Sequence, residues 1–188
     1  MKDFLDKAKV ASRIIATLSP QTKIDVLHQM ADVLETECKR IIQENQKDLD
    51  EAKKNNLSSA LVDRLMLNAK RIAEMAKAIR EIAALKEPVG RILEGWVVPS
   101  GLRKKKVSIP IGVVAIIYES RPNVTSDTAA LCFKSGNACV LKGGKEAFYS
   151  NAIIATLLQE VLKNNDLPKE IISLLPDYSR EGVAKLIK

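Results

Sequence analysis

Apolar side chains recur at helical spacing through residues 1–85. The clearest stretch opens at Ser19-Pro20, a cap residue followed by proline, and predicts one helix of about six turns. Asn55-Asn56 interrupts the pattern, Ser58-Ser59 offers a new cap, and a last helix follows Asn68. The apolar stripe of the first helix consists of Ile24, Leu27, Ala31, Leu34, Cys38 and Ile41, and the last helix is predicted to bury Ile72, Met75, Ile79 and Ile82.

A β-hairpin is predicted where this helical region ends at Pro88-Val89-Gly90. Two β-prone runs follow, residues 91–98 and 102–109, separated by Pro99-Ser100-Gly101. The second run alternates apolar and polar residues, so one of its faces is polar. Trp96 lies in the first run, and we interpret it as a packing anchor rather than a platform for stacking bases.

After Pro110 the pattern changes to alternating strands and helices. The apolar, β-branched run at residues 113–117 is typical of a strand buried on both faces. A polar loop at 119–127 leads into a short helix at about 128–134. The remaining elements are predicted as a buried strand at 138–141, a helix at 147–163, a strand at 171–175 and a helix at 179–187. This order predicts an α/β fold with a parallel, right-handed sheet, preceded by helices and a hairpin.

The composition is ordinary for a globular protein, with 46% hydrophobic and 28% charged residues. The sequence contains no apolar run of about 18 residues that would cross a membrane. Its first ten residues mix acids with lysines and lack the apolar segment of a secretory signal. Three cysteines without metal-type spacing and a single histidine disfavour a disulfide framework and a zinc site. We therefore expect a cytoplasmic protein with no bound metal and no membrane partner.

The formal net charge of +7 suggests more than one kind of partner. Much of the excess lies in one run, Arg103 to Lys106, a feature also found in proteins that bind nucleic acid. Only 4% of the residues are aromatic, so few side chains are available to stack on single-stranded bases. We favour a solvated basic strand or a face that attracts phosphorylated small molecules, and expect no nucleic-acid partner. Charge alone does not separate these interpretations.

Two loops at the carboxyl ends of the first two predicted parallel strands carry the candidate chemistry. The sequence lacks both GxGxxG and GxxxxGK[ST], so neither common phosphate-loop motif is available. The first loop spans Glu119 to Asn123, and the second spans Lys142 to Glu146. Gly143 and Gly144 would let the backbone approach a ligand closely, and the flanking lysines would attract phosphate. Solvated loops with a helix cap would explain the same residues about as well.

Both loops lie within residues 110–147, which contain the motifs YESRPNVT, KSGN and KGGKEA. This segment resembles the signature region of the glutamate-5-semialdehyde dehydrogenases, also called gamma-glutamyl phosphate reductases, a branch of the aldehyde dehydrogenase superfamily. The resemblance extends upstream through ENQKDLDEAKKNNLSSALVDRL, the EPVG turn and the predicted hairpin. It therefore covers essentially the whole chain.

The resemblance implies three parts: an N-terminal helical segment at residues 1–90, an oligomerisation-type hairpin at 91–109 and a Rossmann-like cofactor-binding region at 110–188. It also implies a homo-oligomer. The implied activity is the NADPH-dependent reduction of L-glutamyl 5-phosphate to L-glutamate 5-semialdehyde, with release of phosphate, in proline biosynthesis. The expected ligands are thus a small phosphorylated substrate and the cofactor NADP(H).

The resemblance also assigns roles to individual residues. Asn123 corresponds to an asparagine whose side-chain amide binds the oxyanion of the reacting carbonyl. Its alternative role is a turn residue that caps the following helix. Lys142 corresponds to a basic residue that contacts the adenosine ribose. Lys145 stands where relatives that prefer NAD often have an acid, so it is expected to pair with the 2′-phosphate of NADP.

The other residues of the two loops receive less specific roles. Arg121 is expected either to pair with the phosphate or carboxylate of the substrate or to be structural. The residues expected to border the cofactor are Tyr118, Glu119, Gly143 and Gly144.

The resemblance places the nucleophilic cysteine in a separate catalytic domain, downstream of this chain. Cys132 falls in a predicted helix and Cys139 in a predicted buried strand, and neither matches the nucleophile motif of the family. We therefore expect the chain to be the N-terminal portion of a longer enzyme and to be inactive alone. The last predicted helix leads to no further strand, which agrees with that expectation. The alternative is a non-catalytic piece that binds nucleotide or assembles with other subunits.

Overall fold

The computed structural model describes residues 1–176 and 180–187. The N-terminal helices are α1 (Lys2–Ile15), α2 (Pro20–Thr36), α3 (Cys38–Lys54), α4 (Ser59–Leu65) and α5 (Ala69–Ala84). A hairpin follows, with strands β1 (Ile92–Val97) and β2 (Arg103–Val107). The later elements are β3 (Val113–Ile117), α6 (Pro122–Lys134), β4 (Ala138–Lys142), α7 (Phe148–Asn164), β5 (Ile172–Leu174) and α8 (Arg180–Ile187), with short 3-10 helices η1 (Lys145–Ala147) and η2 (Lys169–Ile171).

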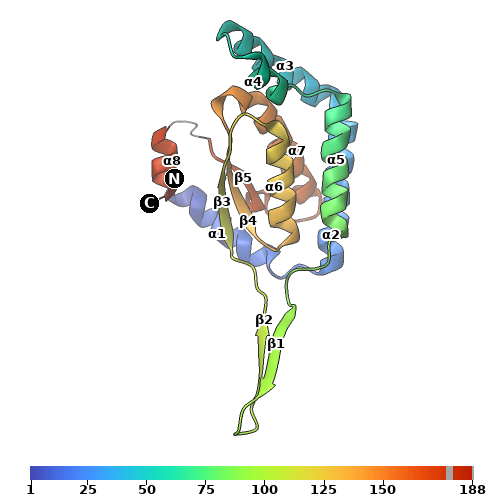
Figure 1. Cartoon of the computed structure of the whole chain (residues 1–188), viewed down its shortest axis with the longest axis vertical. Coiled ribbons are helices and arrows are strands. Elements are labelled where there is room, and N and C mark those ends of the chain that lie inside the picture. The colour runs from blue at the N-terminus through green and yellow to red at the C-terminus, as the bar shows by residue number, and fades with distance from the viewer. Residues whose placement is uncertain (177–179, 188) are drawn as a thin grey trace.

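The α/β fold class predicted from the sequence is confirmed. Strands β3, β4 and β5 are parallel and hydrogen-bonded in that order. In Figure 1 the sheet stands between α1 on one side and α6 with α7 on the other, and α2 and α5 pack against this second layer. One apolar core runs through the layers and includes Leu27, Phe133, Leu141 and Ile154, all completely buried.

The single long helix predicted after Ser19 is wrong, because the chain forms two helices that meet at Glu37. Ser19 does cap the first of them, since its Oγ accepts from the Thr22 N–H at 3.0 Å. Helix α2 ends at Thr36, and α3 starts at Cys38 after Glu37 leaves helical geometry (φ −90°, ψ 15°). Both helices pack on α7, and α2 packs most extensively on α5. The apolar spacing continues across the break because both helices contribute to the same core.

The prediction that β3 is buried on both faces is also wrong. Val114 and Ile116 pack against the core, whereas Ala115 and Ile117 on the opposite face are exposed, Ile117 by 50%. The reason is that β3 lies at an edge of the sheet, and α1 covers mainly the neighbouring β4. For β4 the prediction is confirmed, since residues 138–141 are completely buried.

Helix α6 begins well before its predicted start, so most of the polar stretch predicted as a loop is helical. Arg121 is the N-cap residue, and Pro122 occupies the first helical position, which suits its fixed φ. Thr125 and Ser126 are typical of a loop in the sequence, yet both are completely buried and hydrogen-bonded inside the protein. The correction moves Asn123 from a loop into the first turn of a helix.

The predicted hairpin is confirmed, with β1 and β2 antiparallel and paired from Ile92–Val107 to Val97–Arg103. Every residue of both strands is exposed. Trp96 is 47% exposed, so its interpretation as a packing anchor is wrong for the described chain. The hairpin extends away from the body as a thin arm (Figure 1), and no other element of the described chain packs along it.

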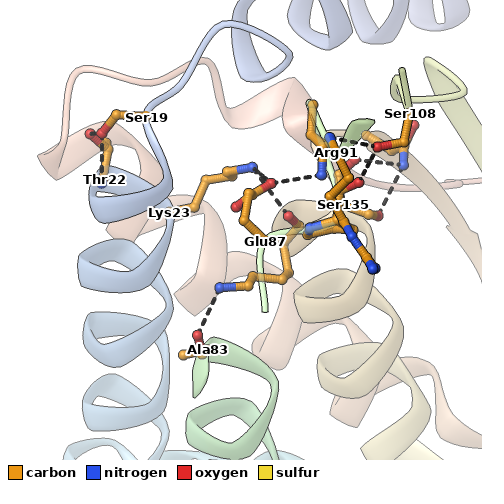
Figure 2. A network of polar contacts seen from close by, with 12 residues as sticks. Ser19, Thr22, Lys23, Ala83, Glu87, Arg91, Ser108 and Ser135 are labelled. Atoms are coloured by element: carbon orange, nitrogen blue, oxygen red, sulfur yellow. Dashed lines mark hydrogen bonds and ion pairs between the residues drawn. The ribbon is translucent and has the colours of Figure 1, made fainter. Parts of the chain in front are cut away.

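A network of polar contacts, with one ion pair, lies where the base of the hairpin meets the helices (Figure 2). Lys23 on α2 is only 2% exposed, and its ammonium lies 2.5 Å from Glu87 Oε1. Lys134 at the end of α6 is also buried, and its ammonium donates to the Ala83 carbonyl oxygen at 2.8 Å. Ser108 Oγ donates at 2.6 Å to the carbonyl oxygen of Pro88, which precedes β1. Removing one partner of a buried ion pair typically costs about 3–5 kcal/mol, so the Lys23–Glu87 pair holds the segment before the hairpin to α2.

The last predicted strand and helix are present, with shorter bounds. The strand covers Ile172–Leu174 and the helix Arg180–Ile187, while Ser179, the predicted first residue of that helix, lies outside the described residues. Across the described chain, no helix is both long enough and apolar enough to cross a membrane.

Candidate functional site

The loops that follow β3 and β4 lie against each other at the carboxyl edge of the sheet. The Tyr118 N–H donates to the Lys142 carbonyl oxygen at 3.1 Å, which extends the strand pairing into the loops. Ser120 Oγ donates to Glu146 Oε2 at 2.8 Å and joins the loops through their side chains. The structure therefore brings the two predicted loops together.

The two glycines of the second loop lie close to other side chains of the protein itself. A Cβ on Gly143 would lie 2.2 Å from Asn151 Nδ2, and a Cβ on Gly144 would lie 2.9 Å from Ser120 Oγ. Neither glycine has a positive φ, so space rather than backbone freedom is the constraint. This intramolecular reason is sufficient to account for Gly143, because Asn151 is completely buried. Contact of either glycine with a cofactor stays a prediction.

Beneath the loops lies a chain of buried hydroxyl and amide groups. The Tyr118 hydroxyl and Thr125 Oγ1 are 2.7 Å apart, and Thr125 Oγ1 donates to Asn151 Oδ1 at 2.8 Å. Thr125 and Asn151 are completely buried, and Tyr118 is half-buried. Of Tyr118 and Glu119, which are both predicted to border the cofactor, only Glu119 is exposed.

A carboxylate from α3 occupies the N-terminus of α7, the helix that follows the second loop. Asp48 is 2% exposed and accepts hydrogen bonds from Tyr149 N at 3.0 Å, Ser150 N at 2.8 Å and Ser150 Oγ at 2.5 Å. Burial raises the pKa of Asp48, and these hydrogen bonds oppose the rise. Helix N-termini are common phosphate sites, but here the protein's own carboxylate takes that position. We therefore expect a phosphate at this edge to be bound by loop residues.

Two lysines of the second loop are placed to attract an anion. Lys142 is half-buried at the end of β4, and Lys145 is exposed at the start of η1. Neither ammonium group forms an ion pair with any residue that the structure describes. Their charges are therefore available to a phosphorylated ligand.

Asn123 and Arg121 line a cleft of about 550 Å³ between α4, α5 and the start of α6. The opposite wall includes Arg71 and Glu74 on α5 and Arg64 on α4. A cleft of this volume lies within the usual range of small-molecule sites. The structure thus places the predicted oxyanion donor and the predicted substrate arginine in one cavity.

The side-chain amide of Asn123 is oriented by Asp127, one turn further along α6. Asn123 Nδ2 donates to Asp127 Oδ2 at 3.0 Å, which leaves its second N–H without a partner in the described chain. Burial raises the pKa of Asp127, and the hydrogen bond from Asn123 opposes that shift. Because Arg121 is the N-cap, the alternative role of Asn123 as a capping residue is wrong. Asp127 was missed in the sequence, although a spacing of four residues indicates contact once the helix start is known.

Neither Cys132 nor Cys139 lines this cleft. Cys132 is 7% exposed and Cys139 is completely buried, as predicted for core residues. A hydrogen bond between the two thiols lowers the pKa of Cys132 and raises that of Cys139, which burial raises further. In the described ranges, no group of side chains is arranged to hold a metal ion.

Comparison with known sequences confirms the resemblance found in the motifs. The sequence profile of the aldehyde dehydrogenase family matches residues 1–188. The chain is 61% identical over 188 residues to a gamma-glutamyl phosphate reductase of Nautilia profundicola and 64% identical to one of Aliarcobacter butzleri. Each match covers 100% of this chain and 46% of the relative, so the chain spans about half the length of these curated relatives.

Solved structures share the fold. The gamma-glutamyl phosphate reductase of Thermotoga maritima matches with a TM-score of 0.96 at 36% identity, over 99% of this chain and 45% of that protein. The protein of the same name from Saccharomyces cerevisiae matches with a TM-score of 0.87 at 30% identity, over 95% of this chain and 46% of that protein.

Proposed function

The chain belongs to the aldehyde dehydrogenase family, and from this premise we propose that it serves the NADPH-dependent reduction of L-glutamyl 5-phosphate to L-glutamate 5-semialdehyde and phosphate, a step of proline biosynthesis. The names of relatives at 61% and 64% identity support this substrate. The observation that carries the proposal is the position of Asn123, whose oriented amide lies in a cleft at the carboxyl end of β3.

Asn123 is proposed to stabilise the charge that develops on the reacting carbonyl. Reduction of a carbonyl places negative charge on its oxygen in the transition state, and a preorganised donor contributes roughly 3 kcal/mol there. Because Asp127 holds one N–H of the amide, the other N–H needs little rearrangement to donate to that oxygen. Arg121, exposed at the same cleft, is proposed to pair with the phosphate or carboxylate of the substrate.

The cofactor proposed for this chain is NADP(H), which supplies the hydride when bound. Lys142 is proposed to contact the adenosine ribose and Lys145 the 2′-phosphate. Two observations support the assignment. Neither lysine forms an ion pair with a residue that the structure describes, and Asp48 already fills the neighbouring helix N-terminus, so a phosphate needs another partner. The residues proposed to border the cofactor are Tyr118, Glu119, Gly143 and Gly144.

We propose a cytoplasmic location for this reaction. All three cysteines are free thiols, which suits a reducing compartment. The basic residues 103–106 lie on the exposed hairpin, and we assign them no nucleic-acid partner because the chain offers few aromatic residues for stacking.

We expect the chain alone to bind NADPH and to show no reductase activity, because none of the described residues that line the cleft is a cysteine. The Aliarcobacter butzleri relative contains a further segment that this chain does not match. Adding that segment as a separate polypeptide should produce reductase activity. The assay follows NADPH formation in the reverse direction, from glutamate semialdehyde, phosphate and NADP⁺.

Two outcomes would contradict this expectation. Turnover by the chain alone that is lost on Cys132→Ser or Cys139→Ser would relocate the active site. NADPH binding without activity after the addition would favour the alternative function, a non-catalytic nucleotide-binding or assembly protein.

The hairpin is proposed to carry a self-association surface. Its strands expose apolar residues on an arm that projects from the body, and such surfaces favour association. We expect a homo-oligomer in sedimentation velocity, and Trp96→Ser should raise its dissociation constant at least about tenfold. The control is Leu61→Ser, which removes an exposed apolar residue from α4 instead. A monodisperse monomer of the unsubstituted chain at high concentration would count against this surface.

A further inference from the structure

The cleft beside α6 is lined by charged residues, and one pair of them serves the structure. Arg71 donates to the carbonyl oxygens of Asp63 and Met66, and its guanidinium pairs with Asp63 Oδ1 at 2.8 Å. These contacts occupy most of the donors that the guanidinium offers. Arg71 therefore braces the turn between α4 and α5.

Four other charged side chains line the same cleft: Arg64, Arg121, Glu74 and Asp127. Within the described residues, none of these four forms an ion pair. Two are positive and two are negative, so an anion alone would meet two carboxylates and a cation alone would meet two guanidinium groups. A ligand that carries both charges satisfies all four, which is the property of an α-amino acid at neutral pH.

Asp127 is the group with most to gain from a cation in the cleft. Its Oδ2 accepts from Asn123 at 3.0 Å, and Oδ1 has only a long contact of 3.5 Å from Ser126 Oγ. Burial raises the pKa of Asp127, because the ionised carboxylate has lost part of its hydration. A cation placed beside Oδ1 would replace that hydration.

The cleft also has an apolar part. Leu67 and Met75 line it and are only 6% and 3% exposed. Apolar side chains at this position suit the methylene groups between the charged end of an amino acid and the end of its side chain.

We propose that this cleft binds the α-ammonium and α-carboxylate groups of an L-glutamyl substrate, with its side-chain carbonyl directed towards Asn123. Glu74 and Asp127 bind the ammonium, and Arg64 and Arg121 bind the carboxylate. The inference rests on the proposed function and extends it, because it identifies the groups that select an amino acid rather than a simple acyl phosphate.

The test is isothermal titration calorimetry of the chain with three ligands. Two of them each lack one charged group of the third, L-glutamate. L-Glutamate carries both α-groups, glutarate lacks the ammonium and 4-aminobutyrate lacks the α-carboxylate. We expect L-glutamate to bind at least about tenfold more tightly than either of the other two.

Two conservative variants assign the charges. Glu74→Gln should weaken L-glutamate about fivefold or more and leave glutarate unchanged, because only the ammonium has lost its partner. Arg64→Gln should weaken L-glutamate similarly and leave 4-aminobutyrate unchanged. Both residues are exposed, so the fold tolerates the changes. The matched control is Lys77→Gln, an exposed residue of α5 that does not line the cleft.

Equal affinity for the three ligands, or a Glu74→Gln variant that weakens all of them alike, overturns the inference. The reductase assay separates it from the proposed function. Activity of the assembled reductase without any preference for L-glutamate by the chain removes only the inference. Selective L-glutamate binding by the chain, with no NADPH-dependent activity after the complementary segment has been added, removes only the proposed function.

Discussion

Replacing Asn123 by alanine is expected to lower kcat of the assembled reductase about 100- to 1000-fold. The reductase is assembled from this chain and the complementary segment of its relative. The substitution removes the amide that lies in the cleft and is oriented by Asp127. KM should change much less, because the oxygen carries its full negative charge only in the transition state. Steady-state kinetics of the reverse reaction measure both quantities.

The matched control for this substitution is Asn165→Ala, the same change at the far end of α7. Asn165 bonds to Gln29 and to the Val161 carbonyl oxygen, away from the cleft. Its loss should leave kcat unchanged. A loss in kcat of less than about threefold for Asn123→Ala would reduce Asn123 to a surface residue of α6, and the proposed function would lose its main support.

The apolar pattern predicts the order of helices and strands correctly, but it does not show what covers each apolar residue. Ile117 and Trp96 are apolar, and yet both are exposed in the described chain. A run of apolar residues indicates that their side chains are buried somewhere, either within the chain or against another subunit. Whether they are buried within this chain depends on which of its elements packs against them. Among the residues that the structure describes, no element covers the exposed face of β3 extensively, because α1 lies mainly over β4.

The start of α6 was predictable from a signal that the sequence contains. Arg121-Pro122 has the same form as Ser19-Pro20, where proline correctly marked the first helical position. The polar residues after Pro122 obscured it, because Thr125 and Ser126 are polar groups satisfied inside the protein rather than by water. Residue type alone does not distinguish these two cases.

The cap on α7 was not predictable from local sequence. Asp48 binds Ser150 across 102 residues, so no spacing rule connects them. The motifs locate the two loops correctly, and the fold then explains why they touch, since β3 and β4 are adjacent and parallel. The motifs do not show that α3 contributes to this edge of the sheet. Its Asp48 occupies the N-terminus of α7 and so excludes a phosphate from that position.

Reversing the charge of Lys145 is expected to lower the preference for NADPH over NADH about ten- to a hundredfold. Lys145 is exposed at the start of η1 and has no ion pair within the described chain. Beside a 2′-phosphate its ammonium forms a charge-assisted contact, which Lys145→Glu would convert into a repulsion. Lys142→Ala should instead weaken both cofactors alike, because the ribose is common to them.

Fluorescence titration of the chain with NADPH and NADH gives the two dissociation constants, and their ratio is the quantity of interest. The matched control is Lys163→Glu, the same charge reversal in the last turn of α7, far along the helix from the second loop. A direct contact with the phosphate requires the ratio to change for Lys145→Glu and to stay constant for Lys163→Glu. Equal changes in both variants would mean that long-range charge sets the preference, because such effects depend on net charge rather than position and weaken in salt. Lys145 would then project into solvent, and its assignment to the adenosine ribose would be wrong.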